Sequence, residues 1–166
     1  MNREIIRKIA ANGFIAALYV AFTLACYPLA FDQIQFRLSE VLILLCFFRK
    51  DFIFGLTAGC AIANCFSTLG PIDIAFGTAA TFIACLGITF SRHLIVAIWF
   101  PVISNAFLVA WELNIVFDTP YWASVAWVAL GEFTVMVVGY IIFMIFRKNT
   151  KFHSIIRSTQ NINFKF

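Results

Sequence analysis

Seven polar or charged side chains stand inside long apolar stretches of this sequence, where such groups are rare and costly. They are Arg37, Glu40, Asn64, Asp73, Asn105, Glu112 and Glu132. Four of them are acids and only one is a base, so a single arginine cannot neutralise all the carboxylates. Surplus buried acids can bind a cationic solute that donates hydrogen bonds, or they can relay protons.

Some of these side chains could instead satisfy one another within the fold. Arg37 could form an ion pair with Glu40 or Asp73, which would make that pair structural. Asn64 and Asn105 could likewise form hydrogen bonds between helices. For these five residues ligand binding and internal pairing both stay open.

Glu112 and Glu132 are harder to explain as internal pairs, because no second base is available to them. We therefore expect both carboxylates to contact a ligand. Two aromatic side chains at a similar level, Trp111 and Trp127, could stack on the face of a flat ligand. Tryptophan also anchors helices at the membrane interface, which is the alternative for both rings.

The sequence contains no other constellation that could do chemistry. The five cysteines lie in apolar stretches, without a Cys-x-x-Cys pair or a histidine at ligand spacing. A closed metal site needs four convergent ligands, so we expect no metal and no disulfide. Because metalloprotease, phosphate-loop and nucleophile-elbow motifs are all missing, we expect no catalytic residue, no bound cofactor and no ATP hydrolysis by this chain.

Composition explains why these polar groups have apolar surroundings. The chain has 166 residues, of which 63% are hydrophobic and 12% are charged, against roughly 45–50% and about 25% in soluble domains. A soluble domain of this length would leave about a third of its unfolded surface in water, so it could not hide this much apolar surface. The composition predicts a membrane protein in contact with lipid and excludes a nucleic-acid-binding module or a disulfide-rich secreted scaffold.

The positioning elements are predicted to be six transmembrane helices in one domain over residues 1–166, an all-α polytopic bundle. The apolar stretches are Ile9–Ala30, Ile34–Phe48, Phe52–Leu69, Ile72–Phe90, Leu94–Phe117 and Trp122–Phe146. A helix needs about 20 residues to cross the hydrocarbon layer, so the second stretch is short. Every lysine and arginine except Arg37 falls on the side of both termini. The positive-inside rule places that side, with the tail 147–166, in the cytoplasm and the polar residues towards the outside.

Small residues recur every four positions on two of the predicted helices. The first stripe consists of Gly13, Ala17, Ala21 and Ala25. The second consists of Gly55, Gly59 and Ala63. Such stripes let helices approach closely. The first stripe could receive a partner helix or pack within this bundle, whereas we expect the second to pack internally.

Several motifs resemble the QueT family of substrate-binding (S) components of energy-coupling-factor (ECF) transporters. They are Ile34-Gln-Phe-Arg-Leu-Ser-Glu40, the run from Gly55 to Asn64, Phe66-Ser67 to Gly70, the run from Asp73 to Thr78, Asn105-Ala106, Trp111-Glu112-Leu113 and Gly131-Glu132-Phe133. The resemblance covers about residues 8 to 146 and includes every polar residue singled out above.

The resemblance implies a six-helix S component of the prokaryotic cell membrane with both termini in the cytoplasm. Such a protein captures a queuosine precursor outside, a 7-deazaguanine such as 7-aminomethyl-7-deazaguanine or queuine. It then topples on a transmembrane coupling subunit joined to two ATPases, which use the ATP. The alanine stripe of the first helix is the docking surface in that wider family, and here it matches Ala17 and Ala21, flanked by Gly13 and Ala25.

Three alternatives stand beside this hypothesis. The chain could be an S component for another vitamin-like solute. It could be a self-sufficient carrier or channel whose intramembrane acids form a proton relay. It could also be a small intramembrane enzyme that uses paired carboxylates as acid and base.

Overall fold

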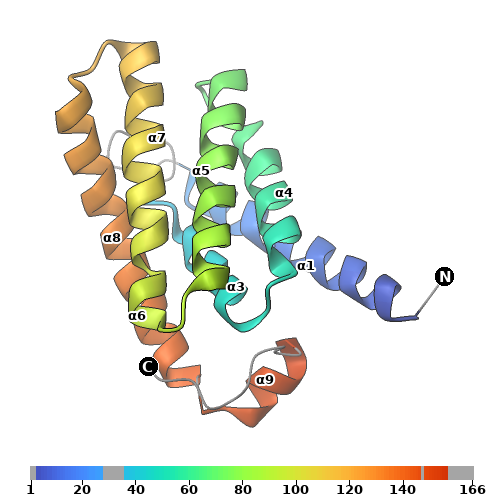
Figure 1. The fold of residues 1–166 in the computed structure, drawn as a ribbon. Coiled ribbons are helices and arrows are strands. Elements are labelled where there is room, and N and C mark those ends of the chain that lie inside the picture. Colours follow the sequence, from blue (N-terminus) through green and yellow to red (C-terminus); the bar gives the residue numbers. More distant parts are fainter. Residues whose placement is uncertain (1–2, 28–35, 147, 157–166) are drawn as a thin grey trace.

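The computed structural model describes residues 3–27, 36–146 and 148–156, and these ranges form helices joined by turns (Figure 1). The elements are α1 (Arg3–Ala25), the 3₁₀ helix η1 (Leu38–Leu44), α3 (Leu45–Phe48), α4 (Phe52–Asn64), α5 (Pro71–Phe90), α6 (Leu94–Ala97), α7 (Trp99–Phe117), α8 (Tyr121–Phe146) and α9 (Thr150–Ile156). The prediction of an all-α chain is confirmed for these ranges.

Within the described ranges, four helical segments are long and apolar enough to cross a membrane, which makes this a multi-pass membrane protein. They are Arg3–Ala25, Pro71–Phe90, Leu94–Phe117 and Tyr121–Phe146, with 23, 20, 24 and 26 residues. The third of these combines α6 and α7. The first helix begins at Arg3, earlier than the predicted Ile9, and residues 28–30 of that predicted span lie outside the described ranges.

The prediction of a second transmembrane helix over Ile34–Phe48 is not confirmed. Residues 34 and 35 lie outside the described ranges, and the helix that follows, Leu38–Phe48, is too short to cross a layer of roughly 30 Å alone. It begins as η1, whose tighter winding gives about 2.0 Å per residue, and continues as α3. Because η1 contacts α1, α4, α5 and α8, other helices enclose it and it does not need to match the bilayer.

The third predicted span, Phe52–Leu69, extends too far at its end. The helix α4 ends at Asn64, and residues 65–70 form turns before α5 begins at Pro71. The hydroxyl of Ser67 accepts a hydrogen bond from the Leu69 amide at 3.2 Å, and Gly70 takes a positive φ of 68°. The turn at Ser67 and the positive φ of Gly70 keep these residues out of a helix that hydropathy alone would continue to Leu69.

The bundle is arranged as a row of neighbouring helices around η1 and α3. In Figure 1, α4, α5, α7 and α8 stand side by side, α1 lies oblique to them, and α9 lies beneath the end that carries α3 and α6. Contacts join α1 to α4, α4 to α5, α5 to α7 and α7 to α8. The polar residues at the end of α4 and the start of α5 therefore lie at the end of the bundle opposite α9.

The packing of α1 on α4 uses the second small-residue stripe, as the sequence predicted. A Cβ atom at Gly55 would lie 2.5 Å from the carbonyl oxygen of Asn12, and one at Gly59 would lie 2.9 Å from that of Ala16. The Gly55 amide donates a 2.8 Å hydrogen bond to the Asn12 side chain. Only glycine permits this approach of the two backbones.

Candidate functional site

Three buried side chains meet where η1, α4 and α5 come together. Arg37 lies just before η1, Asn64 ends α4 and Asp73 lies in the first turn of α5. The Arg37 Nη2 donates to Asn64 Oδ1 at 2.8 Å and to the Asp73 carboxylate at 3.2 Å and 3.4 Å. The Asn64 amide in turn donates to the Asp73 carbonyl at 2.9 Å. For these three residues the structure shows the internal pairing that the sequence left open.

Gly77, one helical turn after Asp73, makes room for this triad. A Cβ atom there would lie 2.5 Å from the Asn64 amide nitrogen and 2.8 Å from Asp73 Oδ1. The triad therefore packs directly against the backbone of α5. Sequence reasoning missed Gly77, although the four-residue spacing of Asp73, Gly77 and Thr81 places all three on one helix face.

Glu40 is held by two hydroxyl groups that the sequence analysis did not single out. The Tyr19 hydroxyl of α1 donates to Glu40 Oε1, and the Thr81 hydroxyl of α5 lies 3.4 Å from the same oxygen. All three side chains are completely buried. The second Glu40 oxygen accepts no hydrogen bond from any described residue. The spacing of Tyr19 and Thr23, which share the inward face of α1, is the signal that could have found the tyrosine.

Glu112 and Glu132 are buried on the neighbouring helices α7 and α8. Glu112 is completely buried, and neither of its oxygens accepts a hydrogen bond from the described part of the chain. Glu132 is 3% exposed and lies near the Asn105 side chain, and its Oε1 accepts no hydrogen bond from a described residue. The Oδ1 of Asn105 is also buried and accepts no hydrogen bond from a described residue. Internal hydrogen bonds among the described residues therefore leave the oxygens of Glu112, the Oε1 of Glu132 and the Oδ1 of Asn105 without partners.

We call the seven buried polar side chains the polar cluster: Arg37, Glu40, Asn64, Asp73, Asn105, Glu112 and Glu132. Glu112 interacts with the charges of Asp73 and Arg37. Glu132 interacts with those of Glu40 and Arg37. One guanidinium therefore faces four carboxyl groups from four helical segments.

The polar cluster is rich in unused acceptors. A buried acceptor without a partner costs about 1–3 kcal/mol, so donors that reached these oxygens would be bound favourably. Among the described residues, no group of three or more His, Cys, Asp or Glu side chains is placed to hold a metal ion. The arrangement can accept several hydrogen bonds and a positive charge from a small solute.

The two tryptophans considered for ring stacking face away from the core. Trp111 is 54% exposed and its ring meets Phe76 edge-on, with 5.6 Å between the centroids. Trp127 is 53% exposed and lines a small cavity of about 120 Å³ with Leu113 and Pro120. The structure does not bring these rings into the polar cluster, and their exposure is typical of interface anchors.

The first small-residue stripe lies on the exposed face of α1. Its members, Gly13, Ala17, Ala21 and Ala25, are all exposed. A Cβ atom at Gly13 would meet nothing within 4 Å. The opposite face, with Ile15, Tyr19 and Thr23, is buried in the bundle. This stripe is therefore a smooth surface that the chain's own described helices leave uncovered.

Comparisons with known proteins agree with the membrane character of the chain. The family profile described as QueT transporter matches residues 9–148. The chain is similar to the "Queuosine precursor transporter QueT" of Lactococcus lactis subsp. cremoris (strain MG1363), with 31% identity over 155 residues that cover 84% of this chain and 91% of the relative. No solved structure gives a significant match. The matched range includes the whole polar cluster.

Proposed function

Because this chain belongs to the QueT transporter family, we propose that it captures a queuosine precursor as the S component of an ECF importer. The name of the Lactococcus relative supports the substrate class. The observation that carries the proposal is the set of unpartnered acceptor oxygens on Glu40, Asn105, Glu112 and Glu132. A ligand with several donors and a positive charge is complementary to them.

A 7-deazaguanine offers donors of the required kind. Its N1–H and its exocyclic amino group lie side by side, so one carboxylate can accept both, as it accepts an arginine fork. An aminomethyl substituent on the five-membered ring adds an ammonium group at the other end. Glu112 and Glu132, on adjacent helices, would receive these two ends. The excess of acids over Arg37 favours the aminomethyl base over the neutral cyano base.

Transport by an S component would also need partners, and the exposed face of α1 is suited to one of them. We propose that Gly13, Ala17, Ala21 and Ala25 dock on the transmembrane coupling subunit, where small side chains permit close helix contact. Two ATPases bound to that subunit would use ATP, because no nucleotide-binding motif occurs in this sequence. The basic turns and both termini would face the cytoplasm of a prokaryotic cell, and the polar cluster would receive its ligand from outside.

The decisive experiment identifies the small molecule that accompanies the purified protein. We expect mass spectrometry of a denatured sample to release a 7-deazaguanine, and calorimetry to show tighter binding of the aminomethyl base than of the cyano base. Release of a different vitamin-like solute, with no binding of either base, would contradict the substrate assignment and leave an S component for that solute.

A self-sufficient carrier is the second candidate, because unpartnered buried acids are also found in proton relays. The two functions differ in their need for partners. Uptake by the reconstituted chain alone, driven by a proton gradient, would support the carrier. Uptake that requires the coupling subunit, the ATPases and ATP would support the S component.

A further inference from the structure

Two hollows adjoin one another along α1, at the end of the bundle near α9. One is a cavity of about 620 Å³ between the start of α1, the turn before α4 and α9, with six charged lining residues: Glu4, Arg7, Lys8, Arg49, Lys50 and Asp51. The other is an apolar groove of about 580 Å³ between α1 and α4, lined by residues that include Ile9, Ala16, Phe54 and Ala58. Lys8 and Asp51 line both hollows, so the charged cavity and the apolar groove adjoin at these two residues.

The start of α1 has the amphipathic character of a helix at the membrane interface. Glu4, Arg7 and Lys8 follow a spacing of three and four residues and share the face that lines the cavity. Ile5 and Ile9 lie four residues apart on another face and are 50% and 62% exposed. A helix with basic residues on one face and large apolar residues on another lies at the level of lipid headgroups.

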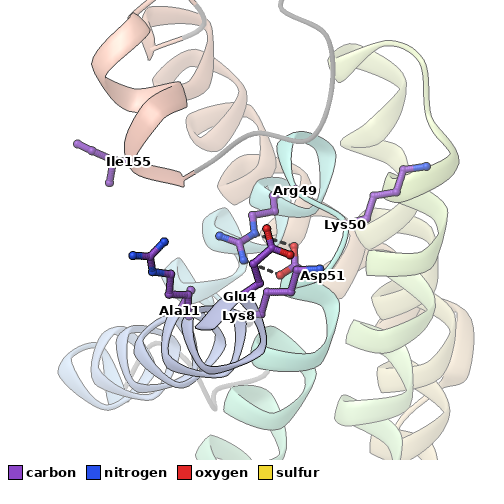
Figure 2. A pocket seen from close by; sticks show the side chains of 8 residues that line it. Glu4, Lys8, Ala11, Arg49, Lys50, Asp51 and Ile155 are labelled. Atoms are coloured by element: carbon purple, nitrogen blue, oxygen red, sulfur yellow. Dashed lines mark hydrogen bonds and ion pairs between the residues drawn. The ribbon is translucent and has the colours of Figure 1, made fainter. Parts of the chain in front are cut away.

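Arg49 and Asp51 neutralise one another in the wall of the cavity. The guanidinium donates to both Asp51 oxygens, at 2.7 Å and 2.6 Å, and also to the Ile156 carbonyl of α9 at 3.1 Å. In Figure 2, Glu4, Lys8, Arg49 and Asp51 lie together, whereas Lys50 extends away from them. Within the described ranges Arg7 and Lys8 form no ion pair. Their charge, which exceeds that of Glu4, remains available to an anion.

We propose that the cavity and groove together bind one anionic phospholipid, with its phosphate at Arg7 and Lys8 and an acyl chain along the groove between α1 and α4. Basic pockets between membrane helices are known positions for anionic headgroups. The Glu4 carboxylate accepts hydrogen bonds from the hydroxyl groups of a phosphoglycerol headgroup, which makes phosphatidylglycerol the fitting lipid class. This site is separate from the polar cluster, does not depend on the transported solute, and shares only Gly13 with the proposed docking stripe.

Native mass spectrometry of the full-length chain tests the headgroup site. The protein is released from micelles that contain equal amounts of phosphatidylglycerol and phosphatidylcholine with the same acyl chains. We expect the wild type to retain phosphatidylglycerol preferentially, and Arg7→Gln with Lys8→Gln to lower that preference about tenfold or more. The control, Arg3→Gln with Lys148→Gln, removes the same charge at two exposed positions that do not line the cavity and should keep the preference.

A second arm tests the groove and the source of the phosphate. Ala58→Phe fills the groove and should reduce lipid retention, whereas Ala79→Phe, at an exposed position of α5, should not. Melting temperatures of all variants confirm that they fold. Millimolar inorganic phosphate should leave the lipid bound. Equal retention of both lipids by the wild type would overturn the proposal, as would an equal loss of preference in the two double variants. An equal effect of Ala79→Phe and Ala58→Phe, or displacement of the lipid by phosphate, would also overturn it.

Discussion

Glu112 and Glu132 are the residues on which the proposed recognition depends most directly. Removing one partner of a buried, charge-assisted hydrogen bond costs about 2–5 kcal/mol, or roughly 30-fold or more in Kd. We expect Glu112→Gln and Glu132→Gln each to weaken binding of the aminomethyl base by at least that factor. The variant that loses contact with the ammonium should also lose the preference over the cyano base. Calorimetry with both bases measures this, and unchanged affinity in both variants would make these acids structural.

Substitution of Gly77 tests whether the triad of Arg37, Asn64 and Asp73 requires a position without a side chain on α5. A Cβ atom at this position would lie 2.5 Å from the Asn64 amide nitrogen, so Gly77→Ala must displace the triad. We expect the unfolding free energy to fall by about 1–3 kcal/mol, as in other overpacked cores. Gly13→Ala is the matched control, because its Cβ meets nothing within 4 Å. Thermal melts in detergent that showed equal effects of both changes would contradict this role of Gly77.

Asp51 gives a pH dependence with a defined sign. Burial alone would raise the pKa of this carboxyl, but the hydrogen bonds and the charge of Arg49 outweigh burial and hold it below its ordinary value. The ionised Asp51 carboxylate therefore stabilises the folded state fully above the unfolded pKa of about 3.9. This stabilisation is lost as the pH falls through the lower pKa of the folded state. We expect the melting temperature of the wild type to exceed that of Asp51→Asn at neutral pH, with a difference that shrinks below about pH 4. Parallel pH profiles for the two proteins would refute the ion pair.

At the scale of elements, α1 has one face for packing within the bundle and another for the proposed docking. Its inward face packs on α4, and its outward stripe carries the proposed docking contacts. Ala17→Leu or Ala21→Leu should abolish uptake by the assembled transporter, because the larger side chain blocks the approach of a partner helix. Ligand affinity should stay within about threefold of the wild-type value, because both positions lie away from the polar cluster. Ala79→Leu on α5 is the matched control for uptake. An equal loss of ligand affinity would show that the stripe serves internal packing.

At the scale of the whole molecule, the helix lengths and the distribution of charge fix a topology that labelling can test. Lys50, Arg92 and Lys148 are exposed near the ends of α3, α5 and α8, and Asp118 is exposed after α7. In a background without the native cysteines, we expect a cysteine at position 118 to react with an impermeant reagent from outside and cysteines at 50, 92 and 148 to react only after lysis. Outside labelling at position 50 would contradict both the orientation and the crossing pattern.

The sequence by itself determined the class of protein, its helical character and the seven residues of the polar cluster. Long apolar stretches and rare buried acids are local signals, because the cost of placing a charge in lipid depends on the residue and its immediate neighbours. The same reasoning is not confirmed for Ile34–Phe48 and is wrong at the end of α4. There the length of each helix is set by turn-forming residues and by the helices that shield it.

Only the tertiary structure decided which side chains meet. Tyr19 and Thr81 are far apart in sequence, yet both contact Glu40, and Gly77 matters only because Asn64 packs against it. Tertiary structure also decided three other features: the outward direction of Trp111, the exposure of the alanine stripe and the adjoining hollows along α1. Each depends on how one helix is rotated and shifted against another, and that is fixed by close packing between distant segments, not by the periodicity of either one.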